Sequence, residues 1–301
     1  MDEREGFCRV GSIEAGEAQY GTAAAGVDAW FALEFDCPWA SKAWEAAAIP
    51  EAARAHVDAW VAATRGARIQ LIRREGRRGA GDIVLLLAST RQDRPLVAEF
   101  RLASLDALTA LDLHAAIAEL RAGRLPAAAR VPALPIALVC TNGKRDRCCA
   151  KWGVPIYEAL AADPRVEAWQ TTHLGGHRFA ATLVWLPSGI CHGRVGPGHV
   201  DALVTAIASG EVGPLDLVRG RTSLSEAAQA AEVLCRQESA LHGLDDVVMD
   251  ATAIETDGTW QVTGRMLEQP VRFTLREVAL GTTAAPSCGK PSEPVTRWEL
   301  A

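Results

Sequence analysis

The segment 136–209 places short apolar runs and helix-like stretches in an order that few folds share. Four runs in it have the length and composition of strands, at 136–140, 166–172, 179–187 and 189–195. Helical patterns lie at 151–163 and at 198–209. The resulting order, β-α-β-loop-β-β-α, predicts a thioredoxin-like domain.

The residues before this segment mix strands and helices differently. Strand patterns there lie at 28–36, 68–74, 82–89 and 95–102, and helical patterns near 41–64 and 105–122. A proline-containing stretch, RLPAAARVPALP at 124–135, is the best linker candidate in the chain. No internal repeat is apparent. We therefore expect an additional N-terminal α/β domain over 1–130.

The residues after Pro214 predict a third part of the chain. A helix is expected near 224–241, followed by three strands in a meander and a polar, proline-rich tail. The predicted fold class is thus α/β, with a thioredoxin-like domain over 131–213 and a C-terminal helix plus β-meander over 214–301.

Composition limits the classes of function. The chain has 301 residues, a net charge of −6 and a sequence pI near 5.7, which argues against a nucleic-acid-binding protein. It lacks an apolar run of the roughly 18 residues that a transmembrane helix needs, and its acidic N-terminus does not resemble a secretory signal. We expect a cytoplasmic protein without membrane contact, in which the eight cysteines are mostly reduced.

The densest set of chemically active residues lies within 38 positions of the segment 136–209. It consists of Cys140, Cys148, Cys149, His173 and His177. Cys140 ends a predicted strand, and the other two cysteines close the polar loop TNGKRDRCC at 141–149, after which a helix should begin beyond the proline at 155.

The two histidines flank Leu-Gly-Gly, which favours a tight loop over a helix because glycine is a poor helix former. Thiolates and imidazoles together suit zinc or an iron–sulfur cluster. The cysteines are more widely spaced than in usual zinc knuckles, so their loop can surround a larger group. Two thiolates and two histidines are also the ligands of a Rieske [2Fe–2S] cluster.

The runs CTNGKRDRCC at 140–149 and HLGGHRFAATLVWLPSG at 173–189 resemble the sucrase/ferredoxin-like family. Weaker similarities extend over nearly the whole chain, including SCGKPSEPVTRW at 287–298. The resemblance implies a thioredoxin-like ferredoxin with a [2Fe–2S] cluster bound by Cys140, Cys149, His173 and His177. The family spacing favours Cys149, with Cys148 as the alternative ligand. Adjacent cysteines in a strand-like stretch point in opposite directions, so only one of the two should bind the cluster.

Other residues of the two motifs are expected around the cluster. Lys144, Arg145 and Arg147 form a basic spot that would stabilise its negative charge, or that is merely a solvated loop. The remaining candidates are Asp146, Gly175, Gly176 and Arg178.

The remaining cysteines are weaker candidates. Cys8, Cys37 and Cys235 are expected to be small buried apolar residues. Cys191 and His192 are adjacent on a predicted strand, so at most one of them faces the cluster. Cys288 lies in the tail, which is expected either to cover the site or to expose this thiol.

These observations favour an electron carrier over an enzyme, with a proton moving together with the electron at the second histidine nitrogens. Two alternatives stay open. One is a binding module in which zinc takes the same ligands, and the other is a thiol–disulfide enzyme, although the chain has no CxxC motif. The partner would be an unidentified redox protein, either a reductase or an acceptor, and the sequence leaves open a homodimer.

Overall fold

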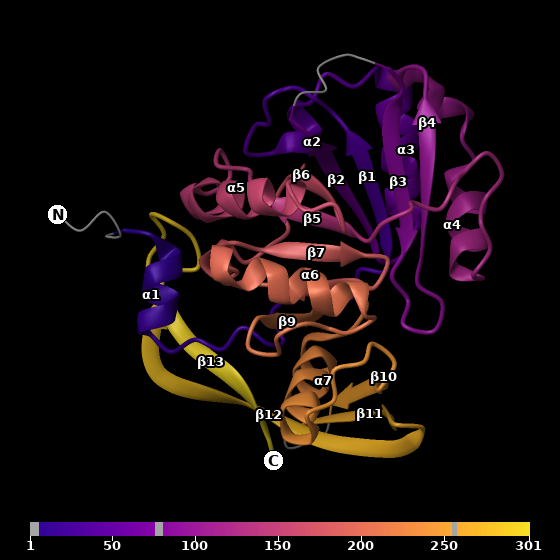
Figure 1. Ribbon diagram of the computed structural model, residues 1–301. Coiled ribbons are helices and arrows are strands. Elements are labelled where there is room, and N and C mark those ends of the chain that lie inside the picture. Colours follow the sequence, from indigo (N-terminus) through magenta and orange to yellow (C-terminus); the bar gives the residue numbers. More distant parts are fainter. Residues whose placement is uncertain (1–5, 76–80, 255–257) are drawn as a thin grey trace.

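The structure is a computed structural model that describes residues 6–75, 81–254 and 258–301. Its strands form a nine-stranded sheet, in the order β4-β3-β1-β2-β6-β5-β7-β8-β9, and a four-stranded sheet, β10-β11-β12-β13. Figure 1 shows that the large sheet curls, so that the strands of the N-terminal part run across those of the middle part. None of the described helices is long and apolar enough to cross a membrane.

The N-terminal part of the large sheet contains four strands. They are β1 (Ala29–Glu34), β2 (Ala67–Arg73), β3 (Ile83–Ser89) and β4 (Leu96–Leu102). β1 is parallel to β2 and antiparallel to β3, which pairs antiparallel with β4. The helical elements are α2 (Ala43–Ala46), α3 (Glu51–Ala63), the 3-10 turn Leu105–Ala110 and α4 (Leu113–Arg121).

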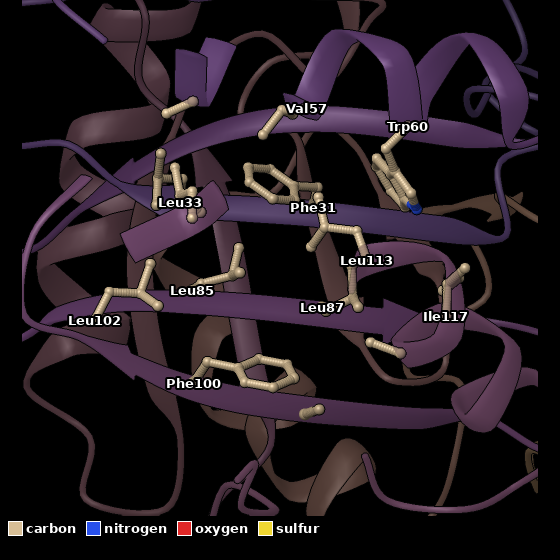
Figure 2. Packing of buried hydrophobic residues seen from close by; sticks show 14 of the residues in the cluster. Phe31, Leu33, Val57, Trp60, Leu85, Leu87, Phe100, Leu102, Leu113 and Ile117 are labelled. Carbon is tan, nitrogen blue, oxygen red and sulfur yellow. The ribbon is translucent and has the colours of Figure 1, made fainter. Parts of the chain in front are cut away.

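One face of these four strands carries an apolar core under α3 and α4 (Figure 2). Phe31 and Leu87 of the sheet meet Trp60 of α3 and Ile117 of α4 in this core. The strands are apolar on both faces because their opposite face is covered as well, by strands of the middle part.

The middle part repeats the same arrangement of strands. It contains β5 (Ile136–Cys140), β6 (Glu167–Thr171), β7 (Leu183–Leu186), β8 (Ile190–His192) and β9 (Val218–Arg221). β5 is parallel to β6 and antiparallel to β7, which pairs antiparallel with β8. Its helical elements are α5 (Arg147–Ala161), α6 (Val200–Ala208) and the 3-10 turns His177–Phe179 and Pro197–His199.

The two parts therefore have the same topology, although their sequences show no repeat. The order β2-β1-β3-β4 matches β6-β5-β7-β8, and both have the strand directions of a thioredoxin-like sheet. The parts join where β2 pairs antiparallel with β6 through Ile72–Thr171 and Arg73–Gln170. The division at 130 stays a prediction, since strands on both sides of it belong to one sheet.

The C-terminal part consists of a helix and an antiparallel sheet. These are α7 (Glu226–Ser239), β10 (Val247–Ile254), β11 (Trp260–Met266), β12 (Gln269–Ala284) and β13 (Glu293–Leu300). The α/β fold class is confirmed, including the thioredoxin-like middle and the C-terminal helix with its β-strands. β9, which the predicted boundary at 213 assigns to this part, pairs instead with β8 of the large sheet.

The end of β12 and the following loop return to the start of the chain. In Figure 1 this yellow segment lies beside α1 (Cys8–Glu14) and near one end of α5. The chain therefore brings residues from both of its ends to the beginning of α5.

Several predicted elements differ from the structure. The polar tail contains the strand β13, so the C-terminal sheet has four strands and not the three of the expected meander, and the strand expected from 179 begins at Leu183. The helix expected near 41–64 is broken at Pro50, and the one expected from 105 begins as a 3-10 turn. α5 begins at Arg147 and contains Pro155 in its interior, because the Asp146 carboxylate accepts a hydrogen bond from the Cys148 backbone N–H and caps the helix early. Cys148 and Cys149 therefore lie on a helix and not on a strand-like stretch.

His192 on β8 makes the stability depend on pH. Its Nε2 lies 2.9 Å from the Val212 carbonyl, and its Nδ1 has no hydrogen-bond partner among the described residues. Burial lowers the pKa of His192 to about 4. Below the ordinary histidine pKa near 6.5, this side chain therefore binds a proton in the unfolded chain but not in the folded one. The free energy of unfolding consequently falls as the pH falls.

We expect this histidine to remove about 3 kcal/mol from the free energy of unfolding between pH 6.5 and pH 4. His192→Gln, which keeps a donor for Val212 but does not titrate, should lose that part of the dependence. Chemical denaturation at several pH values measures it, with the exposed His199→Gln as the control. Parallel profiles for wild type and His192→Gln would contradict the assignment.

Candidate metal centre

Three of the predicted ligand residues meet at the seam between the two thioredoxin-like parts. Cys140 is the last residue of β5, Cys149 lies in the first turn of α5, and His173 follows β6. The possible ligand atoms of these three side chains all lie within 4.8 Å of one another. Both cysteines are buried, with 2% of their surface exposed, among apolar residues that include Trp30, Ile72 and Trp169.

His177 completes the group. Its ring stacks on that of His173, with the centroids 4.2 Å apart and the planes inclined by 21°. Its Nδ1 lies 4.0 Å from the sulfur of Cys149. Gly175 and Gly176 between the histidines have φ values of 99° and 67°, which other residues seldom adopt, so the glycines make this tight loop possible.

The protonation of the group fits cation binding. A hydrogen bond from Cys149, together with the nearby His173 ring, lowers the pKa of Cys140, whereas the bond to Cys140 raises the pKa of Cys149. Burial lowers the pKa of His177 to about 4, so this ring is neutral. The buried Nδ1 of His173 has no hydrogen-bond partner among the described residues. A thiolate, a thiol, the neutral imidazole of His177 and a His173 ring nitrogen without a hydrogen-bond partner suit a soft metal ion or cluster.

Two arginines supply positive charge that the sequence did not reveal. Arg68 of β2 donates to the His173 carbonyl at 2.9 Å, and Arg219 of β9 donates to the Gly175 carbonyl at 3.0 Å. Arg219 is 1% exposed and lies 3.7 Å from the sulfur of Cys191. Both guanidinium groups interact electrostatically with Cys140. They are 72 and 79 residues away from Cys140 in sequence, so no local pattern indicates them.

The other residues that were predicted to surround the cluster lie in several different environments. Lys144 and Arg145 are exposed on the loop before α5. Arg178 forms a 2.6 Å ion pair with Glu17. A Cβ atom at Gly176 would lie 2.4 Å from the Arg219 guanidinium, so this glycine leaves room for the buried arginine.

Asp146, Cys148 and Cys288 belong to a second group of side chains, together with Cys8. Cys148 therefore points away from Cys140. No sequence signal connects Cys8 to this group, because it is 140 residues away from Cys148. The Cys191 sulfur faces the Arg219 guanidinium, whereas the neighbouring His192 ring faces the Val212 carbonyl. Cys37 was expected to be buried and is exposed, whereas Cys235 is buried elsewhere, as expected.

Comparison with known proteins found a family model and a solved structure that each match part of the chain. The family model described as sucrase/ferredoxin-like matches residues 20–220. This range includes Cys140, Cys149, His173 and His177, which together form the Cys–His group. No curated protein sequence matches the chain. A solved structure of a thioredoxin-like [2Fe–2S] ferredoxin from Aquifex aeolicus is 22% identical, with a TM-score of 0.24, and the match covers 28% of this chain and 89% of that one.

The Cys–His group depends on the close approach of α5 to the end of β5. A Cβ atom at Gly153 would lie 2.1 Å from the Cys140 carbonyl oxygen, so only glycine allows this contact. We expect Gly153→Ala to push α5 from β5, to lower stability by about 1–3 kcal/mol and to reduce metal content. Urea unfolding and metal analysis measure both effects. Gly198→Ala, which meets no atom within 4 Å, is the control, and equal behaviour of the two variants would contradict this role.

Proposed function

The chain belongs to the sucrase/ferredoxin-like family, and we propose that it is a one-electron carrier whose Cys140, Cys149, His173 and His177 hold a [2Fe–2S] cluster. The observation that carries the proposal is the meeting of these four side chains at one seam of the fold. Their sulfur and nitrogen atoms are the donor set of a Cys2His2 cluster. When bound, such a cluster would accept and release one electron.

The exposure of the four residues differs in a way that suits electron transfer. The cysteines are buried, whereas His173 and His177 are partly exposed and form the solvent side of the group. A redox partner can therefore approach the histidine edge, while the apolar residues around the cysteines exclude water. A histidine that binds iron through one ring nitrogen can hold a proton on the other, which supports the proposal of proton coupling.

The neighbouring charges bear on the reduction potential. Neutral histidines in place of two thiolates make a cluster less negative, and Arg68 and Arg219 place positive charge on the same side of the fold. Both features stabilise an added electron. We therefore expect a reduction potential above that of plant-type ferredoxins with four cysteine ligands.

Metal analysis tests this function against zinc binding and thiol–disulfide chemistry at the same residues. Protein purified without oxygen should contain about two iron and two acid-labile sulfide per chain. Cys140→Ser and Cys149→Ser should lose both, because each removes a thiolate from the same iron. Cys191→Ser, a substitution of a buried neighbouring cysteine, is the matched control and should keep them. Zinc that depends on Cys140, in protein without iron, would reject the proposal.

Arg68 offers a test of the electrostatic role. Arg68→Met removes one positive charge, while Gln70 still donates to the same His173 carbonyl. We expect the cluster to be retained and its reduction potential to fall, as measured by redox titration of the visible absorbance. Arg101→Met removes a charge that pairs with Glu99 on β4, and it should leave the potential unchanged. An unchanged potential in Arg68→Met would contradict this role.

A further inference from the structure

Three further cysteines form a compact triangle beside the Cys–His group. The sulfur atoms of Cys8 and Cys148 are 3.4 Å apart, those of Cys148 and Cys288 are 3.4 Å apart, and those of Cys288 and Cys8 are 3.7 Å apart. Cys8 and Cys148 are buried, and Cys288 is partly exposed. Since the three residues lie in α1, α5 and the loop between β12 and β13, the fold brings them together from distant parts of the sequence.

The carboxylate of Asp146 lies on the same triangle. Its Oδ1 is 3.1 Å from the sulfur of Cys288, and both of its oxygens are 3.9 Å from the sulfur of Cys8. The carboxylate is also held in place, because Oδ2 accepts hydrogen bonds from the Ser287 hydroxyl at 2.7 Å and from the Cys288 backbone at 2.8 Å. Asp146 is 5% exposed, so the group contains a buried carboxylate next to three thiols.

The distances fit one tetrahedral ion better than a disulfide. Two sulfurs in a disulfide are about 2.0 Å apart, and a third thiol would be left over. Three thiolates bound at about 2.3 Å to one tetrahedral zinc ion have sulfur–sulfur separations of about 3.8 Å. The observed edges of 3.4–3.7 Å are close to this value, and the Asp146 carboxylate is near enough to the sulfurs to supply a fourth ligand.

Two backbone N–H groups point at sulfur atoms of this group. The backbone N–H of Arg9 donates to the sulfur of Cys148, and that of Cys8 donates to the sulfur of Cys288. Hydrogen bonds of this kind stabilise the charged ligands of a metal ion. A surface pocket between α1 and the loop after β12 reaches Cys8 and Cys288, which gives an ion access to the group.

We propose that Cys8, Cys148, Cys288 and Asp146 bind one structural Zn²⁺, at a site separate from the Cys–His group. Soft thiolates select zinc over magnesium or calcium, and zinc binds more tightly than iron(II) to such donors. Four protein ligands leave no open position, as in structural zinc sites. Cys8 and Cys288 lie outside residues 20–220, so the match to the family model does not include them.

The zinc site would fasten both ends of the chain to the first turn of α5. Cys148 precedes Cys149 on this turn, so the two consecutive cysteines serve different groups. Loss of zinc should therefore loosen α1 and the loop around Cys288, and Figure 1 shows these two segments side by side. Limited proteolysis should then cut near either segment sooner than in the wild type.

Zinc and iron content of the full-length protein tests the proposal. Wild type, Cys8→Ala, Cys288→Ala and Cys235→Ala are purified without oxygen from cells supplied with both metals. Cys235 is the matched control, since it is 3% exposed, as is Cys8. We expect one zinc per chain in wild type and Cys235→Ala, near none in the other two variants, and unchanged iron in all four. Absence of zinc from the wild type, or its retention in both Cys8→Ala and Cys288→Ala, would overturn the proposal.

The zinc X-ray absorption spectrum of the wild type gives a test that needs no variant to fold. It should show three sulfur neighbours at about 2.3 Å and one oxygen at about 2.0–2.2 Å. A nitrogen-containing shell, or a disulfide among the three cysteines in the anaerobic protein, would reject the site. Iron and sulfide report separately on Cys140 and Cys149, so failure of the zinc site and failure of the electron-carrier function are distinguishable.

Discussion

The 2.8 Å hydrogen bond from the Cys148 backbone N–H to Asp146 begins α5, and the positions of both cysteine groups depend on it. On a helix, Cys148 and Cys149 point about 100° apart, so one meets Cys8 and Cys288 while the other meets Cys140. The contact between Gly153 and the Cys140 carbonyl then holds the helix against β5. A cap and a glycine thus place the cysteines of two different groups.

The seam between the two thioredoxin-like parts explains why the Cys–His group needs more than the middle part. β2 and β6 pair there, and Arg68 and Gln70 of β2 donate to the carbonyl of His173. The N-terminal part therefore supplies positive charge and hydrogen bonds to the His173 loop of the middle part. Buried guanidinium groups require a compensating negative partner, which the cysteine thiolates and a bound cluster would provide.

Local features of the site could be predicted from the sequence, whereas distant contacts could not. The strand ending at Cys140 and the glycine loop of His173 and His177 follow from short patterns, and the structure brings these residues together. The start of α5 was missed because Pro155 suggested a helix boundary. Arg68, Arg219 and Cys8 could not be placed, since their roles depend on sheet pairing and on the return of the tail to α1. The repeated topology of the two parts could not be predicted either, because apolar patterns of this kind occur in many sequences with other folds.

The central claim is that two histidines and two cysteines of one seam hold a [2Fe–2S] cluster. Pulsed electron paramagnetic resonance of the reduced protein tests it most directly, because the unpaired electron couples to nitrogen atoms bound to iron. The account predicts couplings from two histidine nitrogens, one of which disappears in His173→Cys and the other in His177→Cys. A reduced cluster without nitrogen coupling, or a protein without a paramagnetic reduced state, would contradict it.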